Sequence, residues 1–158
     1  MRVTARASAL IAAAAAGLAF VATAGTTIVP QHSIAGVSLG MTQAQVRAKL
    51  GTPLKVKHAK NEFGTYTTFR YANVTVTFQG DANVTGLMTT SASERTASGL
   101  GVGSTRAQLR AKLPALKCAG STAEGDCHLG AFLPGKTVTD FFIVKGKVVT
   151  VEVGYVID

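Results

Sequence analysis

Tryptophan is absent from this sequence, and cysteine, proline and acidic residues are scarce. The 158 residues include 2 Cys and 4 Pro, and 8 Asp and Glu stand against 16 Lys and Arg, for a formal net charge of +8. Two cysteines are too few for a small scaffold held by several disulfides. The acidic residues form no close pair along the chain, and His32, His58 and His128 are far apart. The sequence therefore predicts no catalytic, cofactor-binding or metal-binding residues, and no enzyme.

The N-terminus has the pattern of an export signal. Arg2 and Arg6 precede an apolar run over residues 7–21, and the segment 22–24 (Ala-Thr-Ala) supplies the small residues that a signal peptidase reads. We predict a cleaved signal peptide over residues 1–24. The alternative, an uncleaved membrane anchor, is weaker because the run is rich in Ala and close to the lower limit of about 17–25 residues for a spanning helix. No cysteine directly follows the run to carry a lipid, so we expect a secreted or extracytoplasmic protein that is not lipidated.

The surplus of basic residues is spread along the chain, with only Lys55, Lys57 and Lys60 forming a cluster. An exported protein need not meet nucleic acid, and we predict no nucleic-acid partner. The scattered charge favours solubility and a weak attraction to anionic surfaces. The alternative is a specific acidic partner or an anionic lipid headgroup.

The two cysteines, Cys118 and Cys127, lie close together in the sequence with Gly120 and Gly125 between them. An exported chain enters an oxidising compartment, and the glycines allow the loop to turn back, so the sequence predicts a disulfide. The alternative is a metal site that adds His128 to the two thiols. It is disfavoured because no fourth ligand stands at a suitable spacing.

The segment 36–51 returns 63 positions later as 99–114, with nine of its sixteen positions identical. Such a match indicates one module used twice. In each copy a Thr, Thr42 or Thr105, stands where a helix N-cap is expected, and a Gly or Pro ends the helical pattern about two turns later. Helices this short are unstable alone, so each is expected to pack against a sheet.

Runs with strand character follow both predicted helices, over residues 65–71, 74–79, 84–90, 128–132, 137–144 and 148–156. We therefore predict an α+β fold of two tandem modules, packed as one unit. Each would hold one or two short helices and a three-stranded antiparallel meander. The expected boundaries are an N-terminal tail at 25–35, a first module at 36–90, a linker at 91–98, and a second module with the disulfide at 99–158.

The first copy carries a short motif over residues 39–54. Its elements are a Gly-Met-Thr triplet, a Val four residues on, and a Leu-Gly-x-Pro stop: Gly40, Met41, Thr42, Val46, Leu50, Gly51 and Pro53. In these residues the chain resembles the SmpA/OmlA family, small lipoproteins of the outer-membrane barrel assembly machinery. The resemblance implies a module that binds proteins or envelope components and has no catalytic residues. The duplicated form resembles the β-lactamase inhibitor protein fold, although Ser104 and Pro114 depart from the motif.

The polar face of the predicted sheet is the candidate binding surface. Alternation along the strands predicts that it carries Tyr66, Thr68, Arg70, Thr75, Thr77, Thr150 and Glu152. We expect Tyr66 and Arg70 to be its anchors, because these residue types dominate interface energetics. The sequence thus favours a secreted, non-enzymatic protein that docks a protein or an envelope component through this face and its loops. The alternative is a cell-wall or envelope scaffold without a specific protein partner.

Overall fold

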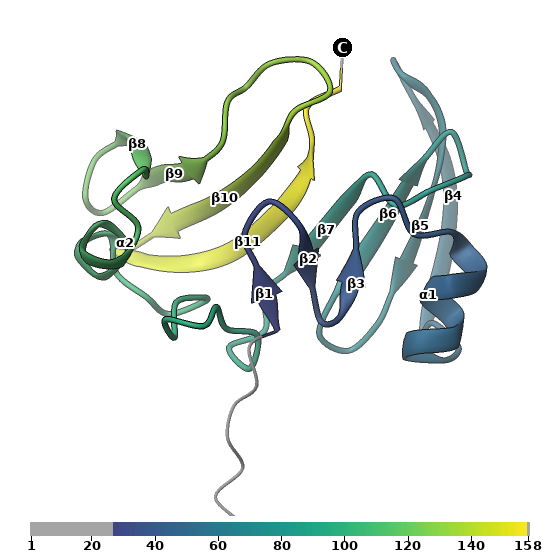
Figure 1. Cartoon of the computed structure of the whole chain (residues 1–158), viewed down its shortest axis with the longest axis horizontal. Coiled ribbons are helices and arrows are strands. Elements are labelled where there is room, and N and C mark those ends of the chain that lie inside the picture. The colour runs from purple at the N-terminus through teal and green to yellow at the C-terminus, as the bar shows by residue number, and fades with distance from the viewer. Residues whose placement is uncertain (1–26, 158) are drawn as a thin grey trace, which may run out of the picture.

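The computed structural model describes residues 27–157 and is dominated by one large antiparallel sheet (Figure 1). Its eight strands follow the order β4-β5-β6-β7-β11-β10-β9-β8. They are β4 (Lys55–Asn61), β5 (Gly64–Arg70), β6 (Thr75–Gln79), β7 (Gly86–Thr89), β8 (Lys117–Gly120), β9 (Gly125–Leu129), β10 (Thr137–Val144) and β11 (Lys147–Tyr155). The first repeat supplies one half of the sheet and the second repeat supplies the other half.

The two halves meet at their last strands. β7 pairs antiparallel with β11, with Leu87 opposite Val153 and Met88 opposite Glu152, so the sheet runs without a break from one half to the other. The strand order is symmetric about this joint, because each half runs outward from its fourth strand to its first.

The predicted fold class is wrong. The molecule is mostly β, with two short helices in the described chain, and it is not a tandem of helix-plus-meander modules. Each half has four strands, because β4 and β8 form at the two outer edges of the sheet. Both are largely solvent-exposed, so neither needs the apolar alternation that marks a half-buried strand.

Helices α1 (Gln43–Leu50) and α2 (Arg106–Lys112) begin in the same way. The hydroxyl of Thr42 accepts from the backbone N–H of Gln45, and the Gln45 side chain accepts from the N–H of Thr42 at 2.8 Å. Thr105 and Gln108 repeat this capping box in α2, and it satisfies amide groups that a helix start leaves unpaired. Within residues 27–157, neither helix has the length and apolar character needed to cross a bilayer.

A second, three-stranded sheet is formed by β1 (Ile28–Val29), β2 (Ser33–Ile34) and β3 (Val37–Ser38). It includes most of the segment expected to be a tail, and Ile28, Ile34 and Val37 are fully buried in the core. The backbone carbonyl of Arg95 accepts hydrogen bonds from the amides of Thr27 and Ile28. The segment expected to be a linker thus holds the start of the described chain in place.

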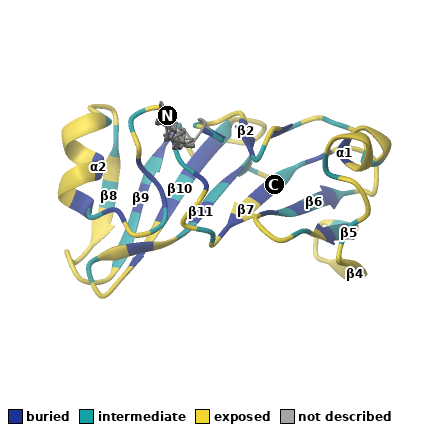
Figure 2. Cartoon of the chain, turned by 90° about the horizontal axis from the view of Figure 1, so that it is seen from below, coloured by how far each residue is buried: buried dark blue, intermediate teal, exposed yellow. Residues whose placement is uncertain are grey.

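The helices and the small sheet lie along one side of the large sheet and bury that face (Figure 2). At one end of the core, the rings of Phe69 and Phe78 pack edge to face with centroids 4.8 Å apart. The guanidinium of Arg47 on α1 lies 4.1 Å from the Phe69 ring centroid, a cation–π contact. The opposite face of the large sheet carries neither helix nor small sheet, and we call it the open face.

Candidate functional site

The strand register aligns one residue from each strand in a single row across the open face. Consecutive members are directly opposite one another, in the order Lys55, Arg70, Thr75, Met88, Glu152, Asp140, His128 and Lys117. Basic side chains stand towards both ends of this row, and the two acidic side chains stand next to the joint. The two halves differ in the side chains of this row although their strand orders correspond.

All seven residues of the predicted binding face lie on the open face. The strands that carry them are β5 for Tyr66, Thr68 and Arg70, β6 for Thr75 and Thr77, and β11 for Thr150 and Glu152. The register brings Thr68 opposite Thr77 and Arg70 opposite Thr75. Thr150 lies in the other half of the sheet and is not brought next to this group.

A groove of about 560 Å³ opens on this face over the joint between the halves. Four of the predicted residues line it, namely Thr68, Thr75, Thr77 and Glu152, whereas Tyr66, Arg70 and Thr150 do not. Gly86 and Gly154, which are directly opposite each other, leave the floor without side chains.

The walls of the groove are largely apolar. Met88, Phe132, Tyr155 and Ile157 line it, and each is at least 36% exposed to solvent. Phe132 comes from the loop after β9, and Ile157 from the segment after β11. Sequence reasoning missed these residues, because the sequence does not show which loops fold over which strands. Exposed aromatic and aliphatic side chains gathered round a concavity are typical of binding surfaces.

Two carboxyl groups lie side by side in the groove. Asp140 on β10 is directly opposite Glu152 on β11, and both line the concavity. Burial raises the pKa of each, and the neighbouring Asp140 carboxylate raises the pKa of Glu152 further. For Asp140, the charge of His128 works against this rise in pKa and that of Asp126 adds to it. Acidic residues that form no close pair along the chain are thus brought together by strand pairing.

His128 on β9 lies next to this pair, directly opposite Asp140 on the neighbouring strand β10. Its Nδ1 atom is 3.8 Å from Oδ2 of Asp126, and its ring packs edge to face on Phe132 with centroids 4.6 Å apart. The sequence predicts no metal-binding residues, yet ligand atoms of Asp126, His128 and Asp140 lie within 4.8 Å of one another. The strands bring together residues that are separated in the sequence.

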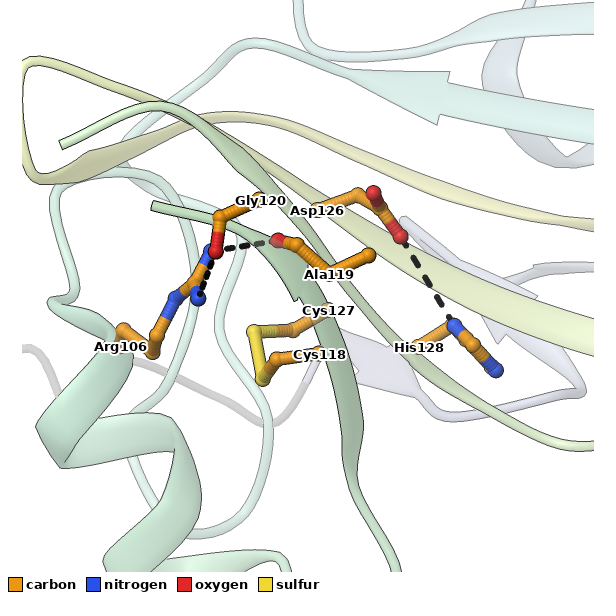
Figure 3. The surroundings of a disulfide bond; sticks show 7 residues. All are labelled: Arg106, Cys118, Ala119, Gly120, Asp126, Cys127 and His128. Carbon is orange, nitrogen blue, oxygen red and sulfur yellow. Dashed lines mark hydrogen bonds and ion pairs between the residues drawn. A yellow bond between two sulfur atoms is a disulfide. The ribbon is translucent and has the colours of Figure 1, made fainter. Parts of the chain in front are cut away.

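The predicted disulfide between Cys118 and Cys127 is present, and it joins directly opposite residues of β8 and β9. Figure 3 shows it beside Arg106, whose guanidinium donates to the carbonyls of Ala119 at 2.7 Å and Gly120 at 3.1 Å. The edge strand β8 is thus held both by a covalent bond and by a side chain from α2. A structural disulfide indicates an oxidising, extracytoplasmic compartment. The predicted signal peptide over residues 1–24 lies outside the described residues.

No family model matches the chain, and no curated protein matches its sequence. The resemblance to the SmpA/OmlA family therefore has no support from either comparison. Among solved structures, an extracellular protein containing an SCP domain from Bacillus anthracis superposes with a TM-score of 0.52 and 9% identity. The alignment covers 74% of this chain and 44% of that protein, so the chain spans less than half of its length. At this identity the likeness is one of fold.

Two further structures align more loosely. A DUF4309 family protein from Bacillus subtilis gives a TM-score of 0.44 at 12% identity, over 79% of this chain and 88% of that one. A protein provisionally assigned as a β-lactamase inhibitor protein, from Streptococcus mutans, gives 0.33 at 11% identity, over 78% and 86%.

Proposed function

We propose that this protein is an extracytoplasmic, non-enzymatic binding module that takes up a segment of a partner protein in the groove of its open face. The observation that carries the proposal is the combination of exposed apolar walls with two half-buried carboxyl groups, Asp140 and Glu152. Exposed Phe and Tyr side chains supply contact area at a low entropy cost. They are therefore suited to anchoring a partner.

The charge of the groove sets the kind of segment that fits. The chain as a whole is basic, but the titratable groups that line the concavity, apart from the Tyr155 phenol, are the acids Asp140 and Glu152. A Lys or Arg side chain of the partner would neutralise both while its aliphatic stem packs on the apolar walls. A partner loop or extended strand that carries a basic side chain therefore fits better than an acidic one.

A second function, an envelope scaffold without a specific protein partner, is favoured by the edge strand β4. Lys55, Lys57 and Lys60 are all exposed on it. Lysines on an edge strand also protect it from pairing with other chains. A strand of this charge would hold the protein on anionic wall or membrane material by a salt-sensitive attraction.

A substitution at Gly86 can block the groove without disturbing the fold. A Cβ at Gly86 would meet only the Thr77 Cβ, at an ordinary 3.8 Å, so Gly86→Val fills the floor of the groove without a backbone clash. Val also suits a strand better than Gly does. The matched control is Thr150→Val, on the same face but outside the groove.

The test is cross-linking and capture with the untagged, oxidised chain 25–158, using culture fluid and envelope fractions of the source organism. The proposal expects a protein that Gly86→Val loses and Thr150→Val retains. Capture that both variants retain would contradict the groove assignment. The scaffold function is supported instead if no protein is captured and wall material retains the chain. That retention should be lost in high salt. It should also be lost in a triple variant that carries Lys55→Gln, Lys57→Gln and Lys60→Gln.

A further inference from the structure

The cluster formed by Asp126, His128 and Asp140 lies on the open face at the side of the groove. Asp126 and His128 are two residues apart on β9 and point the same way, and Asp140 on β10 is directly opposite His128. The disulfide partner Cys127 lies between them in sequence and points to the core, where it is fully buried. Figure 3 shows the Asp126–His128 pair and the disulfide on different sides of β9.

The His128 imidazole has an unsatisfied nitrogen. Nδ1 is buried and has no hydrogen-bond partner among the described residues, and the nearest acidic oxygen, Oδ2 of Asp126, stands 3.8 Å away. Buried polar atoms in folded proteins are nearly always paired, so an orphaned one calls for an explanation. The Phe132 ring packs against the imidazole and limits the side-chain rotation by which it could reach another partner.

We propose that Asp126, His128 and Asp140 bind a divalent transition-metal ion of the Zn²⁺ type. The ligand atoms of the three side chains lie within 4.8 Å of one another. A tetrahedral ion at about 2.0–2.2 Å from its ligands places those ligands about 3.3–3.6 Å apart. Small rotations about the side-chain torsions close this gap. These three side chains are the protein ligands, and the fourth tetrahedral position is left to water, as in sites where Zn²⁺ has three protein ligands.

The first half of the protein is an internal control for this cluster. Counting outward from the joint, Thr75 occupies the place of Asp140 and Arg70 the place of His128. Thr68, two residues before Arg70, corresponds to Asp126. The same strand arrangement thus forms with two threonines and an arginine, so the fold does not require a ligand set here.

The donor types select the kind of ion. One imidazole nitrogen with two carboxylate oxygens suits Zn²⁺, whereas Ca²⁺ and Mg²⁺ are bound by oxygen ligands alone. The cysteines cannot take part, because both are in the disulfide. The site is partly open on the open face, since the Asp126 side chain is 38% exposed.

Isothermal titration of the untagged, oxidised chain 25–158 with ZnCl₂ tests the proposal. We expect one ion per chain, and a rise in Tm of about 5–10 °C at a hundredfold excess over Kd. Loss of one ligand, in His128→Gln or Asp140→Asn, should weaken Zn²⁺ binding by at least about 10–100-fold. Mutation of residues that only hydrogen-bond to a metal ligand already lowers metal affinity by that factor. The matched control, His58→Gln, removes a histidine from the opposite face and should bind as the unaltered chain does.

Two further measurements keep a folding defect from imitating the result. Melting of each variant in EDTA confirms that it folds, and ¹H–¹⁵N spectra of the imidazoles show whether Zn²⁺ perturbs His128 rather than His32 or His58. No binding at 100 µM Zn²⁺ would overturn the proposal, and so would binding that survives both ligand variants. Equal, weak binding of Ca²⁺ and Zn²⁺ would also overturn it, because it would indicate only an acidic surface. Each of these outcomes is independent of whether Gly86→Val releases a protein partner.

Discussion

Asp140 and Glu152 are directly opposite each other on β10 and β11, with both carboxyl groups on the open face. Like charges in opposed positions of a sheet are destabilising. Burial, and after it the charge of Asp140, raises the pKa of Glu152 above its ordinary value of 4.5. The pair is therefore a source of instability that a cationic group can relieve.

The pH dependence of a Glu152→Gln variant tests this pair in the metal-free protein. An acid whose pKa is raised on folding binds protons more tightly in the folded chain, so stability falls as pH rises from the unfolded pKa through the folded pKa. The variant removes that loss. We expect its Tm to match the unaltered chain near pH 3.5 and to exceed it by about 1–4 °C at pH 7. A melting series in EDTA measures this, and a difference that is constant with pH would contradict it.

Removal of the disulfide should destabilise the second half of the molecule. The Cys118–Cys127 bond closes a loop with a sequence separation of 9. For a loop of this length the entropic stabilisation is about 2–3 kcal/mol. We expect a Cys118→Ser, Cys127→Ser double variant to lose that much in urea unfolding and to show faster amide exchange in β8 than in β5. Unchanged exchange in β8 would mean that Arg106 alone holds this strand.

Arg106 should contribute more to the stability of the fold than Gln43, which occupies the same place in the first repeat. The Arg106 side chain is 8% exposed and donates to the carbonyls of Ala119 and Gly120. Hydrogen bonds from a charged donor are worth about 1.5–3 kcal/mol, so Arg106→Ala should lose an amount in this range. Gln43 is only partly buried and donates to one carbonyl, that of Asp81. Chemical denaturation of Arg106→Ala and Gln43→Ala compares the two, and equal losses would be contrary to expectation.

The two capping boxes should behave as independent copies. Thr42→Ala and Thr105→Ala each remove a hydroxyl that accepts from a helix amide, and each should cost about 1 kcal/mol. The helices lie at opposite ends of the large sheet (Figure 1), so the double variant should lose the sum of the two values. Urea unfolding of the four chains measures this. A double variant that loses much less than the sum would show that the helices are coupled.

The sequence predicted the features that depend on local chemistry. The helix caps, the helix stops and five of the six predicted strand runs correspond to elements of the structure, because each depends on neighbouring residues. The sixth run, 128–132, shares only residues 128–129 with β9. β4 was missed because the segment Lys-Val-Lys-His-Ala-Lys is exposed on nearly every residue and so has no apolar face. β1, β2 and β3 were missed because strands of two residues are too short to show a period of alternation.

The acidic pair could not be predicted because it depends on a β-bulge. The tight turn at Lys145 and Gly146 pairs Val144 with Lys147 and Ile143 with Val148. Counting back from this turn without interruption would place Asp140 opposite Val151. The register shifts by one residue between Phe142 and Ile143, and Asp140 comes to lie opposite Glu152. One extra residue in a strand leaves no mark in the pattern of apolar residues, but it decides which side chains meet.

The joint between β7 and β11 also limits how far such a chain can grow. Each half contributes its last strand to this contact, so equivalent edges pair as in an isologous dimer. Neither of these two edges is then free to pair with another strand. The edges left free belong to β4 and β8, which are the first strands of their halves. A third copy would have to pair through an edge of another kind. Duplication of this unit therefore closes at two, unlike the open-ended stacking of a solenoid.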